Sequence, residues 1–200
     1  MKQECYNLNG KKVFIPIPES YKDCMTLIQS DRYRISGRIE SFILIILRNL
    51  RPFSSSVLFW LRLCQYKGWC WIICRIMYEF ASRKTQVQIS TSTKIGYVFY
   101  IGHGICMVVG VGTIIGNNVN LSQFLNIGTN HETPAIIGDN VYIGPHVSVV
   151  EDVKIGSNSS IGAGAVVTRD VPENATVAGV PAKILNYYSP GRYINNRWLL

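Results

Sequence analysis

An aliphatic side chain recurs every six residues through the second half of the chain. The spacing holds in three successive frames, and all thirteen framed positions are Ile, Leu or Val. They are Ile89, Ile95, Ile101, Val109, Ile115, Leu121, Ile127, Ile137, Ile143, Val149, Ile155, Ile161 and Val167. Repeated units stack on their neighbours, so this period constrains the fold more than any local propensity does.

Each unit contains one short strand and one corner. Glycine follows most of the framed aliphatics, and Asn or Asp often comes next, as in Gly116-Asn117-Asn118 and Gly138-Asp139-Asn140. These residue types tolerate the positive φ that a tight corner requires. Three units close one triangular coil, and stacked coils bury a continuous aliphatic column while their strands hydrogen-bond to one another. The sequence therefore predicts a mainly β, parallel solenoid.

One segment has the length of a membrane span. The eighteen residues from Val98 to Ile115 contain no Asp, Glu, Lys or Arg. They also contain four glycines and keep the six-residue period, which a lipid-facing helix has no reason to do. We therefore assign them to the solenoid.

Charge is distributed unevenly along the 200 residues. Lys and Arg number 15 against 6 acidic residues before Ile95, and 5 against 6 from Ile95 onward. This asymmetry excludes a uniformly basic nucleic-acid-binding protein and indicates two regions with different roles. We expect no nucleic-acid partner.

The cysteines and the first residues of the chain indicate the cellular compartment in which we expect the protein. Six cysteines form no Cys-x-x-Cys pair, and no His, Cys and carboxylate set has metal-ligand spacing, so we expect neither a disulfide framework nor a metal. No apolar segment follows the first charged residues. The expected compartment is the cytoplasm.

The repeat and the ending Ala-Gly-Val-Pro-Ala-Lys at residues 178–183 resemble the hexapeptide-repeat acyltransferases. Within them the chain is most similar to serine acetyltransferase and to relatives that acetylate sugars of surface polysaccharides. The resemblance covers about residues 85–186 and implies a left-handed parallel β-helix. We expect a helical region at 1–84, the β-helix acyltransferase domain at 85–186 and a tail at 187–200.

The six-residue spacing is interrupted at two places, which we call slips, and each slip contains a histidine. The step from Ile101 to Val109 is eight residues and includes His103, and the step from Ile127 to Ile137 is ten and includes His131. Extra residues leave a solenoid as external loops, where functional groups are often placed. The family's general base lies in an Asp-His-Ala-Thr-Gly-Ile-Val-Val-Gly run, which aligns with residues 102–110 and implies that His103 is the base.

The resemblance implies that His131 also takes part in catalysis, because Pro134-Ala135-Ile136 follows it as in the family. An acceptor hydroxyl needs such a base to lose its proton as it attacks a thioester. His146 lies in a regular unit, and we expect it to have no catalytic role.

Two departures from the family pattern concern the acceptor. The acidic residue before the base is replaced by Gly102, so Glu132 or a backbone carbonyl would have to orient His103. The Arg that helps to hold the serine carboxylate is replaced by Asn130, and an amide suits sugar hydroxyls better. We therefore expect Asn130 and Glu132 to bind a sugar or polysaccharide precursor. Serine O-acetylation in cysteine biosynthesis is the alternative, and an inactive β-helix scaffold is the alternative from another class.

The donor implied by the resemblance is acetyl-CoA, lying along one edge of the β-helix. Small residues at Gly128, Gly144, Ala163 and Gly164 would let the pantetheine arm lie against the backbone. Lys183 is placed to meet a CoA phosphate as a point charge. For each glycine the alternative is that it only turns a corner.

The front of the chain has helical patterns at 21–30, 41–50, 54–65 and 69–82. The family's helical region mediates assembly, and its active site lies between neighbouring β-helices of a trimer. We expect a homotrimer, with a dimer of trimers as a further form. The other interpretation is peripheral contact with an anionic membrane, suggested by the tryptophans and arginines of this region, which are Trp60, Trp69, Trp71, Arg48, Arg51, Arg62 and Arg75.

Overall fold

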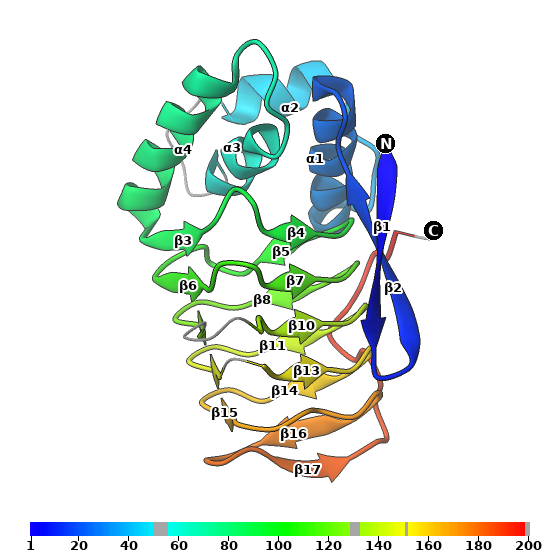
Figure 1. Cartoon of the computed structure of the whole chain (residues 1–200). Coiled ribbons are helices and arrows are strands. Elements are labelled where there is room, and N and C mark those ends of the chain that lie inside the picture. Colours follow the sequence, from blue (N-terminus) through cyan, green and yellow to red (C-terminus); the bar gives the residue numbers. More distant parts are fainter. Residues whose placement is uncertain (50–55, 129–132, 151, 199–200) are drawn as a thin grey trace.

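The computed structural model describes residues 1–49, 56–128, 133–150 and 152–198. A group of helices lies on one end of a stack of short strands, and a hairpin runs along its side (Figure 1). The helices of the described residues are α1 (Tyr21–Ser36), α2 (Phe42–Asn49), α3 (Ser56–Cys64) and α4 (Trp71–Thr85).

The strands form three sheets whose members come from successive coils. The first sheet contains β4 (Lys94–Ile95), β7 (Ile114–Ile115), β10 (Ile136–Ile137) and β13 (Lys154–Ile155). The second contains β5 (Tyr100–Ile101), β8 (Asn120–Leu121), β11 (Tyr142–Ile143), β14 (Ser160–Ile161), β16 (Thr176–Ala178) and β17 (Lys183–Asn186). The third contains β3 (Val87–Ile89), β6 (Met107–Val109), β9 (Asn126–Ile127), β12 (Ser148–Val149) and β15 (Val166–Val167).

The strand register confirms the hexapeptide repeat. In the second sheet Ile101 pairs with Leu121, and Ile143 pairs with both Leu121 and Ile161. The framed aliphatics of the other two sheets align in the same way. Of the thirteen framed aliphatics, all are buried except Ile101, which is half-buried. The pairing of Val109 with Ile127 places the two extra residues of the first slip in the corner after Ile101. The predicted β-solenoid is therefore confirmed.

The first residues form a hairpin that the sequence analysis did not predict. Strands β1 (Lys2–Leu8) and β2 (Lys11–Ile17) are antiparallel and joined by Asn9 and Gly10, whose φ angles are 52° and 85°. Leu8, Val13 and Ile15 pack against Ile114 on the outer side of the first sheet. The region 1–84 is thus helical only from α1 onward.

The tail beyond β17 returns along the second sheet to α1. The ring of Tyr193 lies 4.5 Å from that of Tyr142, and Arg34 of α1 donates a hydrogen bond of 2.7 Å to the carbonyl of Tyr193. Trp198 stacks on Tyr97 of the first coil. The hairpin and the described part of the tail lie on the same side of the molecule (Figure 1). The hairpin and the tail therefore cover outer parts of two of the three sheets.

A buried ion pair fixes the helices on the first coil. The guanidinium of Arg62 in α3 donates to both carboxylate oxygens of Asp31 in α1, at 2.8 and 2.9 Å, and to the carbonyls of Ile95 and Gly96. Asp31 also accepts the backbone N–H of Phe99. Burial raises the pKa of Asp31, while Arg62 and this N–H oppose the rise.

The helices largely follow the predicted segments. Helix α1 is longer than predicted and continues to Ser36, where Gly37 ends it with φ of 64°. None of the helices in the described ranges has the length and apolar character needed to cross a membrane.

Candidate functional site

The corner between the second and third sheets repeats one backbone geometry. The N–H of Phe124 donates to the carbonyl of Ile105 one coil earlier, and His146 and Gly164 repeat this bond in the following coils. Cys106 holds the equivalent place in the first of these coils, and φ is positive at all four positions, between 48° and 69°. We call the stack of Cys106, Phe124, His146 and Gly164 the corner column.

His103 lies in the insertion just before this column. Its φ is 58° and its side chain is exposed. No described residue hydrogen-bonds to its imidazole, whereas the sequence predicts that Glu132 or a backbone carbonyl orients it. Glu132 lies outside the described residues, and no carbonyl of the described chain takes that role. His103 is therefore available for a substrate.

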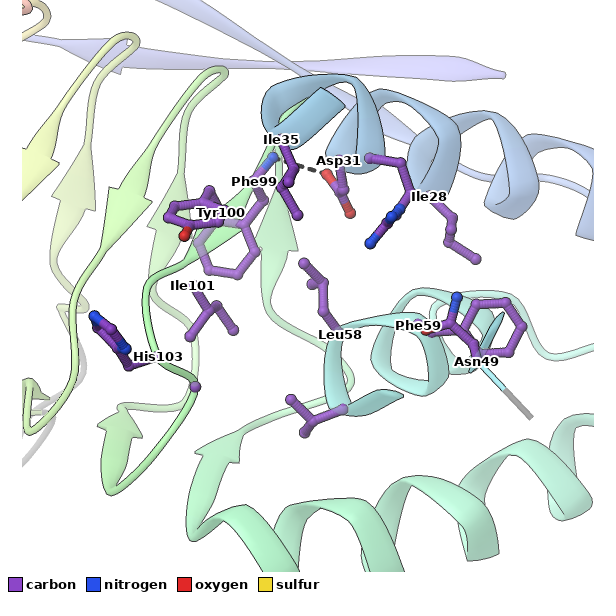
Figure 2. Close-up of a pocket in the computed structure, with 13 residues that line it drawn as sticks. Ile28, Asp31, Ile35, Asn49, Leu58, Phe59, Phe99, Tyr100, Ile101 and His103 are labelled. Carbon is purple, nitrogen blue, oxygen red and sulfur yellow. Dashed lines mark hydrogen bonds between the residues drawn. The ribbon is translucent and has the colours of Figure 1, made fainter. Parts of the chain in front are cut away.

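A cavity of about 230 Å³ opens beside His103 (Figure 2). Its walls come from α1, α3 and β5, and His103 lies at one end, next to Tyr100 and Ile101. Most of the lining is apolar, and the carboxylate of Asp31 is already bonded to Arg62. This cavity was missed by sequence reasoning because residues 28–49, 57–59 and 99–104 meet only through tertiary packing.

The expected donor residues divide between two places. The corner between the second and third sheets, where His103 lies, also contains Gly144, Ala163 and Gly164. Gly164 lies three coils from His103, about 14 Å at normal strand spacing. A Cβ at Gly144 would lie 2.9 Å from the backbone N of Ala163, so coil stacking alone requires glycine there. Gly164 has φ of 69° and no atom within 4 Å of a Cβ position, so its surface is open to a ligand.

The other two donor candidates lie elsewhere. Gly128 follows β9 at the corner between the third and first sheets, and its N–H bonds to the carbonyl of Val149. Lys183 begins β17, the antiparallel last strand of the second sheet, and its side chain is exposed. The structure therefore does not gather all five donor candidates at one corner of this chain.

Known proteins share both the repeat and the arrangement. The family described as bacterial transferase hexapeptide (six repeats) matches residues 134–169. A serine acetyltransferase of Bacillus licheniformis is 35% identical over 127 residues, which make up 60% of this chain and 57% of that protein. The chain thus spans little more than half of that relative.

Solved structures extend the likeness into the helices. A serine acetyltransferase in complex with CoA superposes with a TM-score of 0.64 at 26% identity, covering 82% of this chain and 68% of that one. The Neisseria gonorrhoeae enzyme in complex with serine gives 0.64 at 25% identity, covering 82% and 69%. The chain is a hexapeptide-repeat protein similar to the serine acetyltransferases.

In this hexapeptide-repeat protein the second slip is only partly described. Asn130, His131 and Glu132 lie outside the described residues, so their predicted roles stay predictions. Strand β9 ends at Ile127 and β10 begins at Ile136. The second slip therefore falls one corner further along the coil than the insertion of His103.

His146 has a packing partner. Its ring stacks on that of Phe124, with centroids 4.6 Å apart and planes 12° from parallel. Ring stacking is therefore a structural role for His146 in the corner column.

Within the described ranges, the cysteines and the possible metal ligands are further candidates for a catalytic centre. All six cysteines are free, and burial raises the pKa of Cys24, Cys64 and Cys74 to about 12. Such thiols are poor nucleophiles because the thiolate form is suppressed. Among the described residues no three His, Cys, Asp or Glu side chains are placed to hold a metal ion.

Proposed function

We propose that the protein is an acetyl-CoA-dependent O-acetyltransferase in which His103 is the general base. The observation that carries this is the position of His103: an exposed imidazole without a described partner, in a two-residue insertion, on a chain similar to serine acetyltransferases. His131 is proposed to assist from the second loop, with Asn130 and Glu132 binding the acceptor.

The chemistry follows from these groups. The imidazole of His103 removes the hydroxyl proton while the acceptor oxygen attacks the thioester carbon. Backbone N–H groups of the corners are suited to stabilise the tetrahedral oxyanion. The C–S bond then breaks, and the proton on His103 passes to the departing thiolate of CoA. The base is neutral again, and the products are an O-acetyl ester and free CoA.

One observation supports a donor site along the corner column: Gly164 leaves the backbone surface open there. Lys183, which lies outside the column on β17, offers an exposed cation for a phosphate. We propose that Gly128, Gly144, Ala163, Gly164 and Lys183 contribute to CoA binding. Because Gly128 lies at another corner, a neighbouring copy would supply it.

For the acceptor, the comparisons favour the alternative of the sequence analysis. Relatives similar to this chain are named serine acetyltransferases, and one was solved with serine. We therefore propose L-serine as the first acceptor. A sugar hydroxyl is the second candidate, because Asn130 replaces the family Arg and residues 128–136 contain Glu132 but no Lys or Arg.

An acceptor panel tests both candidates. With acetyl-CoA present, we expect release of free thiol with L-serine at kcat/KM above about 10⁴ M⁻¹s⁻¹, and slower release with nucleotide sugars and hexosamines. A reaction without acceptor measures background hydrolysis. Turnover of sugars but not of serine would select the second candidate. No thiol release above background with any acceptor would support the inactive scaffold instead.

Assembly gives a second prediction. The hairpin and the tail lie against the first and second sheets, whereas the outward residues Gln88, Val108 and Asn126 of the third sheet are exposed. We propose that three copies associate through this side, so that neighbours complete each site. Sedimentation velocity across a dilution series should show a trimer at concentrations where activity is full. A fully active monomer would contradict the proposal.

A further inference from the structure

Helix α4 presents an apolar stripe away from the protein. Its inner face packs on α3 and β3 through buried residues that include Cys74, Tyr78 and Ala81. On the outer side five large apolar side chains are 39–68% exposed. These are Ile72, Ile73, Ile76, Met77 and Phe80. A helix at the surface of a globular protein normally places polar residues on its outer face. An apolar outer face is therefore suited to contact another surface.

Other segments of the helical region also expose large apolar side chains. Trp69, just before α4, is 90% exposed. On α2 the side chains of Ile43, Leu44, Ile46 and Leu47 are exposed as well. The described helical region thus carries large apolar side chains on the outer faces of two helices.

Cations border the stripe. Arg83 and Lys84 are exposed at the end of α4, and Arg75 and Arg83 line a groove of about 240 Å³ together with Ile76 and Phe80. The acidic residue of this groove, Glu79, is paired with Arg75 at 2.5 Å. Over residues 38–84 the sequence has eight Lys and Arg against two acidic residues.

We propose that the apolar stripe of α4 docks this protein on an anionic lipid surface. Apolar side chains enter the boundary between headgroups and acyl chains, while the exposed Arg83 meets lipid phosphates and carboxylates. A second copy across a two-fold axis fits less well, since such a contact would bring the same positive edge against itself. The inference goes beyond the acetyl transfer and does not depend on it.

Binding to vesicles tests the inference. We expect the full chain to cosediment with phosphatidylcholine vesicles containing about 30 mol% phosphatidylserine, and weakly with phosphatidylcholine alone. Phe80→Asp should weaken binding by roughly tenfold or more, because the ring no longer enters the lipid. Arg83→Gln should weaken binding to the anionic vesicles about fivefold. Phe14→Asp, on the hairpin, is the matched control and should bind like the unaltered protein.

Several results would overturn the inference. One is the absence of binding to anionic vesicles, and another is an equal loss in Phe80→Asp and Phe14→Asp. A third is lipid-independent self-association that Phe80→Asp abolishes, which would show a second copy on the stripe. Thermal unfolding of each variant identifies any that do not fold, and Arg83→Gln, an exposed polar change, keeps the test open in that case.

Discussion

Replacing His103 with alanine is expected to lower kcat for acetyl transfer by roughly 10² to 10⁴-fold, the contribution of a positioned general base. Its side chain is exposed and bonds to no described residue, so its loss should leave the unfolding temperature nearly unchanged. Release of free thiol at saturating acetyl-CoA and acceptor measures kcat. A thermal scan of the same sample shows that the fold is intact.

His146→Ala provides the matched control. His146 is also a histidine with positive φ in the same corner, two coils further on, and its ring contacts Phe124. Its loss should change kcat by less than the loss of His103. If His103→Ala turned over at a near-normal rate, His103 would have no place in the mechanism.

Replacing Arg62 with leucine is expected to reduce the free energy of unfolding by about 3–5 kcal/mol. The change leaves the buried carboxylate of Asp31 without its cation and the carbonyls of Ile95 and Gly96 without a donor. For a chain of this length the corresponding fall in Tm is roughly 6–20 °C. Urea denaturation followed by circular dichroism measures it.

An exposed ion pair supplies the comparison. Arg48 pairs with Glu40 at 2.8 Å, and its side chain is about half exposed. Arg48→Leu should cost no more than about 1 kcal/mol, because water screens such pairs. Equal losses of unfolding free energy in the two variants would show that burial does not make the Arg62 pair more stabilising than the exposed pair.

Much of the solenoid could be predicted because its cause is local. A six-residue period places one aliphatic per strand, and Ile115, Leu121 and Ile143 have no exposed surface in the structure. The hairpin was missed although Asn9-Gly10 is a strong two-residue turn signal between alternating strands.

The site could be predicted less completely. The frame slip located His103 at a corner, because extra residues cannot enter the packed column. The apolar cavity beside it depends on Leu58 and Phe59 of α3 meeting Phe99 of the first coil. Such contacts join residues some forty positions apart, and no repeat or motif indicates them or the neighbouring Arg62 to Asp31 pair.

The returning tail also changes how this solenoid unfolds. Stacked repeats contact only their neighbours, so a linear array can fray from either end independently. Here Arg34 of α1 holds the carbonyls of Tyr193 and Asn195, and Trp198 lies on Tyr97. Opening the last coil would pull on contacts at the first, and opening the first would release the tail. Amide hydrogen exchange should therefore show the two ends protected as one cooperative unit, in contrast to the graded protection of an open array.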